Sequence, residues 1–113
     1  MKHIKSIVTA LIILLLIVFY FVQCTPIPQG GELINSVESP DNAYTINAYL
    51  HENSLSSDAV RCEVVNNVND KSRNIYWDYP RSSAEIYWTG EESVNINGVE
   101  LNIKTDIYDF RWH

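Results

Sequence analysis

Residues 74–103, NIYWDYPRSSAEIYWTGEESVNINGVELNI, decide the fold of this chain. They contain the most regular alternation of apolar and polar residues, the strongest turn motif and two of the three tryptophans. Alternation with a period of two residues is typical of a half-buried β-strand. The stretch therefore predicts a β-meander.

The turn motif within this stretch is Asn97-Gly98, which stands between two alternating runs. Asn-Gly is the preferred two-residue loop of a type I′ hairpin, because both of its residues accept positive φ. This turn aligns four apolar residues on one face of the hairpin, so the register and the hydrophobic pattern agree. The predicted pairs are Ile96 with Val99 and Val94 with Leu101.

Further alternating runs lie on the N-terminal side of the hairpin. We expect an all-β domain of about six short antiparallel strands, arranged as a meander, a curled sheet or a small sandwich. In the tail, Ile107 and Tyr108 extend a strand or cover an open edge. The predicted strands are 43–50, 59–65, 73–77, 84–88, 94–96 and 99–101.

The N-terminal third has a different composition. Residues 7–22, IVTALIILLLIVFYFV, contain no charged residue, and together with the residues just before them they approach the length of a membrane-spanning helix. Lys2 and Lys5 precede this segment, so the positive-inside rule predicts a cytoplasmic N-terminus at 1–6. The β-domain, 39–113, is then expected outside the cytoplasm, behind a linker at 23–38.

Three fates of the apolar segment are open. It is a cleaved signal peptide, a lipoprotein signal with Cys24 as the lipidated residue, or an uncleaved signal anchor. No small residues form a cleavage site at its end, and Gln23 stands where a lipoprotein signal places a small residue. These observations favour the signal anchor. Within the linker, residues 25–31 contain Pro26 and Pro28 followed by two glycines. This composition predicts a spacer that is first stiff and then flexible.

Charge is distributed unevenly along the chain. The net charge is −6, all 14 acidic residues follow the apolar segment, and only six of the eight basic residues do. That part therefore carries −8. A domain this acidic is repelled by phosphates, which argues against a nucleic-acid partner.

The histidines and cysteines indicate neither a metal site nor a cofactor. His3, His51 and His113 are not spaced as ligands, and the sequence has no Cys-x-x-Cys motif. We expect no enzyme, because one outward-facing histidine in a small open sheet does not form a preorganised site that excludes water. Cys62 lies in an apolar strand and is interpreted as a small buried hydrophobe, with a disulfide to Cys24 as the alternative.

Two groups of residues are candidate binding sites. Tyr49, Tyr76 and Tyr87 are predicted to face away from the apolar side of their strands, as an exposed aromatic face for a partner. The alternative is that these tyrosines pack on Phe110 and Trp112 of the tail as a second core layer. Arg61 and Glu63 share a strand face, as an ordinary ion pair or as a polar recognition spot.

Five blocks of the chain resemble a known family when they are taken in order between residues 39 and 111. The blocks are SPDNAYTINAYL, VRCEV, NIYWDY, AEIYWTGEESVNINGVELNI and YDFR. They resemble the domain of unknown function 5412 family, which comprises small membrane proteins of Gram-positive bacteria. The resemblance implies a membrane segment followed by a short domain, and it brings no activity, ligand or site residue.

These observations predict a membrane-anchored extracytoplasmic β-domain that binds another envelope protein, as an interaction or accessory module. The alternative is a module that binds cell-wall glycan or a small ligand. The sequence leaves the partner and the oligomeric state open.

Overall fold

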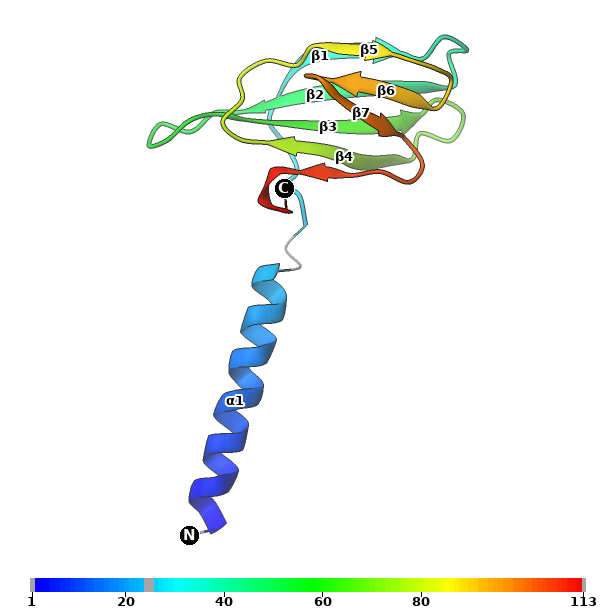
Figure 1. The fold of residues 1–113 in the computed structure, drawn as a ribbon. Helices are drawn as coiled ribbons and strands as arrows, with labels where there is room; N and C mark the ends of the chain where they lie inside the picture. The colour runs from blue at the N-terminus through cyan, green and yellow to red at the C-terminus, as the bar shows by residue number, and fades with distance from the viewer. Residues whose placement is uncertain (1, 24–25, 113) are drawn as a thin grey trace.

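The computed structural model describes residues 2–23 and 26–112, with the side chains of 4–19 and 26–112. A single N-terminal helix stands away from a mostly β domain (Figure 1). The elements are α1 Lys2–Gln23, β1 Glu32–Glu38, β2 Tyr44–His51, β3 Ala59–Asn66, β4 Ser72–Asp78, β5 Ile86–Trp88, β6 Ser93–Ile96, β7 Val99–Asn102, β8 Tyr108–Asp109 and the 3₁₀ helix η1 Phe110–Trp112.

The strands form two sheets that pack on each other. The larger sheet has the order β1-β2-β3-β4-β8, and the smaller one has the order β5-β6-β7. Their facing sides share one apolar core, so the mostly β prediction is confirmed and the two-sheet alternative holds. The core residues are Ile46, Ala48, Val60, Cys62, Val64, Ile75, Tyr76, Val94, Ile96, Leu101 and Ile103.

The β6–β7 hairpin forms with the predicted register. Ile96 pairs with Val99, and Val94 pairs with Leu101. Asn97 has φ +50° and Gly98 has φ +89°, and positive φ at both residues is the requirement of a type I′ turn. Local turn chemistry therefore determines this element.

Strand β1 corrects the predicted linker. Residues 32–38 were expected to belong to a spacer, but they pair antiparallel with β2 along most of its length. The sequence of β1, ELINSVE, does not alternate between apolar and polar residues, and most of its side chains are exposed. Alternation therefore could not predict this strand. Its partner supplies the pairing, and Ser39 closes the intervening turn by accepting from and donating to the backbone of Tyr44.

The free edge of β1 is covered by the smaller sheet. The Asn35 side chain donates to the Ala84 carbonyl at 3.0 Å, and the Trp88 indole N–H donates to the Val37 carbonyl at 3.3 Å. The second bond engages a backbone carbonyl of β1, and unpaired backbone groups of an edge strand are otherwise open to another chain. The two sheets are therefore joined by polar contacts as well as by the core.

The opposite edge corrects the strand count and direction. Tyr108 and Asp109 form β8, which pairs in parallel with Tyr76 and Trp77 of β4. The prediction of about six strands, all antiparallel, is thus wrong. The expectation that the tail covers an open edge is confirmed, because β8 lies beside β4 at the end of the larger sheet.

A β-bulge in β4 corrects the predicted facing of its aromatic residues. Cys62 of β3 pairs with Tyr76 and Glu63 pairs with Asn74, which leaves Ile75 as an extra residue. An extra residue shifts the alternation of side chains, so Ile75 and Tyr76 are both fully buried. Trp77 lies on the other side of the sheet with its partner Arg61.

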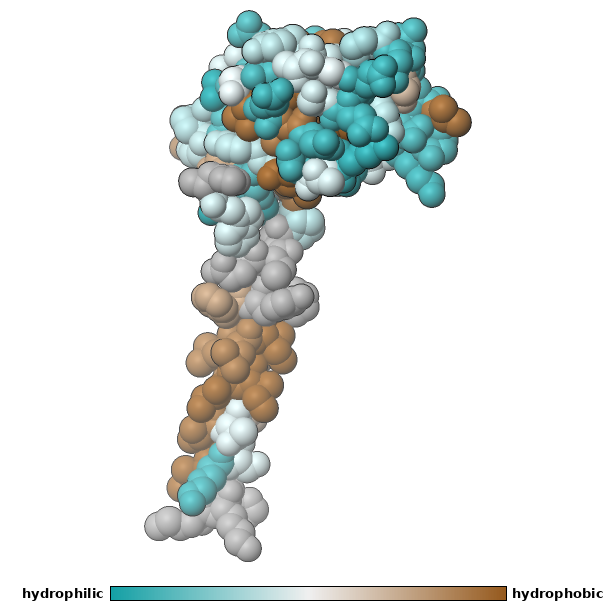
Figure 2. All heavy atoms as spheres, turned by 45° about the vertical axis from the view of Figure 1, so that its right-hand side comes forward, coloured by the Kyte–Doolittle hydropathy of each residue, from teal (hydrophilic) through white to brown (hydrophobic). Residues whose placement is uncertain are grey.

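From residue 10 to residue 19, every residue of helix α1 is apolar. Its large apolar residues from Ile4 to Phe19 are 47–68% exposed. Figure 2 shows this segment as the hydrophobic part of the molecule, whereas the visible face of the β-domain is mostly hydrophilic. No helix within the described residues has both the length and the hydropathy that a membrane span requires.

Candidate functional site

A polar cluster centred on Arg61 occupies the outer face of the larger sheet, the face opposite the core. The Arg61 side chain is only 4% exposed. Its guanidinium lies 4.2 Å from the centre of the Tyr49 ring and donates to Asn74 Oδ1 at 2.8 Å. It also lies 3.4 Å from Glu63 Oε2, and the Tyr49 hydroxyl donates to Glu63 Oε1 at 3.0 Å. We call these four residues the outer-face cluster.

The described residues just before β1 lie across this cluster. We call residues 26–31 the strap. The Gly30 carbonyl accepts from Arg61 Nε at 3.3 Å and from Nη2 at 3.0 Å. Ile27 is buried, and Gly31 packs closely against β2 and His51. The prediction of a flexible spacer is therefore wrong for Gly30 and Gly31, which a buried arginine holds against the sheet.

The two glycines of the strap meet different constraints, and this difference yields a prediction. Both have positive φ, +92° and +99°, which is strained for alanine by about 1–2 kcal/mol. A Cβ at Gly30 meets nothing within 4 Å, whereas one at Gly31 lies 2.8 Å from the Leu50 carbonyl oxygen. We expect Gly31→Ala to lower the free energy of unfolding clearly more than Gly30→Ala.

Urea unfolding of the full chain in detergent, with limited proteolysis of the strap, measures this difference. Gly30→Ala is the matched control, because it carries the backbone strain without the clash. Equal effects of the two substitutions would mean that Gly31 does not contact the sheet as described.

His51 and Trp77 border the strap on the same face. Their rings meet edge to face at 5.1 Å. His51 Nε2 is buried and has no hydrogen-bond partner among the described residues. Burial, and secondly the charge of Arg61, lower the pKa of His51, so the ring is neutral near pH 7. Burial and the hydrogen bond to Glu63 raise the pKa of Tyr49.

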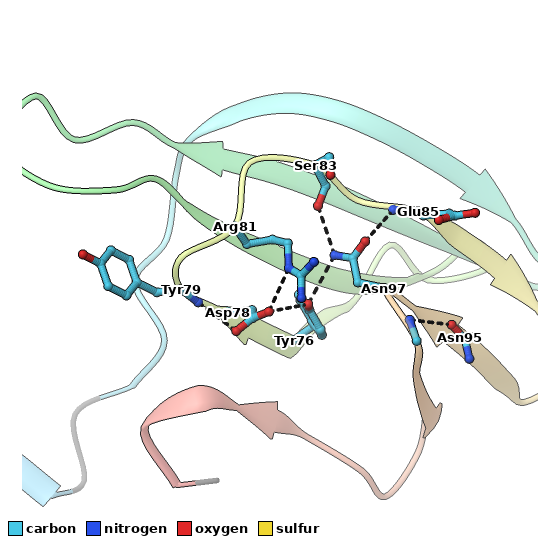
Figure 3. Close-up of polar contacts among 9 residues, drawn as sticks. Tyr76, Asp78, Tyr79, Arg81, Ser83, Glu85, Asn95 and Asn97 are labelled. Carbon is cyan, nitrogen blue, oxygen red and sulfur yellow. Dashed lines mark hydrogen bonds and ion pairs between the residues drawn. The ribbon is translucent and has the colours of Figure 1, made fainter.

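A second polar cluster joins the two sheets (Figure 3). The Tyr76 hydroxyl donates to Asp78 Oδ2 at 3.0 Å, and the Asn97 amide donates to the Tyr76 hydroxyl oxygen at 3.2 Å. Asn97 also donates to the Ser83 carbonyl, and Arg81 Nε donates to Asp78 Oδ2 at 2.9 Å. We call Tyr76, Asp78, Arg81 and Asn97 the inter-sheet cluster. It ties the tip of the β6–β7 hairpin to β4.

The ionisable core groups are held in their neutral forms. Burial raises the pKa of Tyr76 to about 12, assisted by Asp78 and opposed by the Asn97 hydrogen bond. Burial also raises the pKa of the Cys62 thiol to about 12. Cys62 is a free and buried cysteine, as predicted. The predictions of lipidation and of a disulfide both involve Cys24, which lies outside the described residues.

The structure separates the three tyrosines that were predicted to form one face. Tyr49 belongs to the outer-face cluster, and Tyr76 is buried in the core, where it stacks on Tyr108 at 5.3 Å. Tyr87 is 53% exposed on the smaller sheet. The predicted aromatic face is therefore wrong. The alternative was that the tyrosines pack on Phe110 and Trp112. Tyr76 does pack on a ring of the tail, but that ring is Tyr108.

The second predicted site was the pair Arg61 and Glu63. Arg61 and Glu63 do contact each other, but they lie beneath the strap and not on an open surface. Asn74 was not predicted as a site residue, and Asn97 was predicted only as a turn residue. The adjacent glycines Gly30 and Gly31 could have indicated that this segment packs against the sheet, because glycine allows a close approach of the backbone.

Both clusters hold distant segments of the chain together by hydrogen bonds and ion pairs. No group of three or more histidine, cysteine, aspartate or glutamate side chains gathers as metal ligands in the described part of the chain. In the outer-face cluster, Arg61 holds a backbone carbonyl, and Tyr49 and the neighbouring His51 are both neutral near pH 7. The cluster is thus built to grip an extended peptide segment, which here is the strap.

Fold and site together define a small two-sheet β-domain that holds the chain leading to an apolar N-terminal helix. The chain belongs to a family of unknown function, DUF5412, whose family model matches residues 1–113. The family resemblance seen in the sequence blocks is thereby confirmed. Searches among curated proteins and among solved structures found no match.

Proposed function

We propose that α1 anchors this protein in a membrane and that its β-domain, outside the cytoplasm, binds another protein of the cell envelope. The observation that carries the proposal is the exposure of α1, whose large apolar side chains from Ile4 to Phe19 are 47–68% exposed. Water solvates such a surface poorly, whereas lipid acyl chains match it. A helix of 22 residues is about 33 Å long, comparable with a hydrocarbon core of about 30 Å.

The orientation follows from charge. Lys2 and Lys5 lie at the N-terminal end of α1, and basic residues favour the cytoplasmic side. The strongly acidic β-domain follows the other end. The strap supports an accessory role, because a docked connection presents the domain in a defined orientation relative to the anchor.

The surface proposed for the partner lies where β5 runs beside β1. Tyr87 of β5 is 53% exposed on the smaller sheet. Exposed tyrosines are favoured at protein interfaces, because they bury a large amphipathic ring at a low entropic cost. Both sheets support this surface, since Asn35 and Trp88 bond across the seam.

The first test is membrane fractionation followed by extraction with alkaline carbonate. Retention of the full chain in the membrane supports anchoring, and release into the soluble fraction contradicts it. The second test is in-cell photo-crosslinking from Tyr87, with the exposed loop residue Leu55 as the matched control position. One dominant envelope protein captured from position 87 alone supports the interaction module. Binding to purified wall glycan that is lost in Tyr87→Ala, without a captured protein, supports the glycan alternative instead.

A further inference from the structure

Aromatic residues gather at the edge of the larger sheet that is formed by β8 and η1. The rings of Tyr79 and Phe110 are 5.7 Å apart, and those of Trp77 and Phe110 are 6.4 Å apart. Tyr79 is 37% exposed, and Trp112 in η1 is 54% exposed. In Figure 3 Tyr79 points away from the inter-sheet cluster. We call Tyr79, Phe110 and Trp112 the aromatic edge.

This edge lies on the side of the domain from which α1 departs. In Figure 1, β8 and η1 are the part of the β-domain nearest to the end of α1, whereas β5 lies at the far side. The tether between helix and domain is short. α1 ends at Gln23 and Ile27 is already buried in the domain, so the four intervening Cα–Cα steps span at most about 14 Å.

A tether of this length keeps the aromatic edge close to the end of the helix. The headgroup layer on each side of a bilayer is about 5–7 Å thick. Tyrosine and tryptophan favour this layer, because their rings are apolar and their O–H or N–H groups reach water. The charges of η1 suit it as well, since Arg111 pairs with Asp109 at 2.6 Å.

We propose that the aromatic edge inserts into the headgroup layer of the membrane that α1 crosses, as a second contact between the domain and the bilayer. This inference rests on the proposed membrane anchoring. The contact is made by aromatic rings and not by basic residues, so it does not depend on anionic lipid. Together with the strap, it holds the larger sheet with its β8 edge toward the membrane and β5 toward the partner.

The test places a genetically encoded fluorescent amino acid at position 112 or at position 87 of the full chain. Tyr87 is the matched control, because it is 53% exposed against 54% for Trp112 and lies on the far sheet. Each protein is reconstituted in vesicles of phosphatidylcholine, with or without phosphatidylglycerol, and with brominated lipids as quenchers. Flotation of the vesicles measures anchoring independently.

The expected result is a blue shift and lipid quenching of the probe at position 112, in both lipid compositions, and neither effect at position 87. Flotation with identical emission at the two positions overturns the aromatic edge and leaves the anchoring intact. A protein that fails to float overturns both. Quenching confined to vesicles with phosphatidylglycerol replaces aromatic insertion with an electrostatic contact.

Discussion

Replacing Arg61 with alanine is expected to lower the free energy of unfolding by about 3–5 kcal/mol, the range for breaking a buried ion pair by removing one partner. The substitution leaves Glu63 and Asn74 in a mostly buried environment without their donor. It also removes both hydrogen bonds to the Gly30 carbonyl. Urea unfolding of the full chain in detergent measures the loss.

Release of the strap is the specific consequence of this change. Cleavage by a protease between residues 26 and 31 is expected to be faster in Arg61→Ala than in the unchanged protein, under conditions where both remain folded. Arg61→Lys is the matched control, because it keeps the charge but loses the planar fork and the stacking on Tyr49. An Arg61→Ala protein with unchanged stability and unchanged cleavage would show that the strap is held by its apolar contacts alone.

Replacing Asn97 with alanine is expected to lower the free energy of unfolding by about 2–5 kcal/mol. Of this, about 1–2 kcal/mol arises from placing alanine at φ +50°, and about 1–3 kcal/mol from removing the amide that bonds the hydroxyl of buried Tyr76. The amide donates to Tyr76 and Ser83 and accepts from the Glu85 N–H. The turn and the contact between the sheets therefore fail together.

Two further variants separate these contributions. Asn97→Gly retains the positive φ and removes only the amide, so we expect it to be less destabilising than Asn97→Ala. Tyr76→Phe removes the hydroxyl to which Asn97 donates. In a double-mutant cycle, Asn97→Gly and Tyr76→Phe are expected to be non-additive, since they remove the same bond. Additive effects would show that the bond between the hairpin tip and β4 does not stabilise the fold.

The regular strands and the hairpin register are predictable from the sequence, because both depend on near neighbours in the chain. Asn97-Gly98 specifies its turn through local backbone conformation, and the alternation around Val94 and Leu101 selects the buried face. Burial of Cys62 follows from the same alternation. The apolar character of α1 is likewise a local property of its residues.

The misplaced elements depend on partners far away in the chain. β1 is polar and exposed, and it becomes a strand only because β2 offers it a free edge. β8 is two residues long and pairs with β4 across a separation of about thirty residues, which no local pattern encodes. The bulge at Ile75 turned Tyr76 inward, so alternation gave the wrong face for the aromatic residue on which the inter-sheet cluster depends.

The candidate site shows the same division. Arg61 and Glu63, two residues apart on one strand, were predictable as neighbours. Their burial was not, because the strap that covers them arrives from the N-terminal side of β1. The sequence by itself determined that this chain joins an apolar helix to an acidic β-domain with a defined central hairpin. Only the tertiary structure decided which polar residues are buried, because burial depends on which distant segment lies against each face of a sheet.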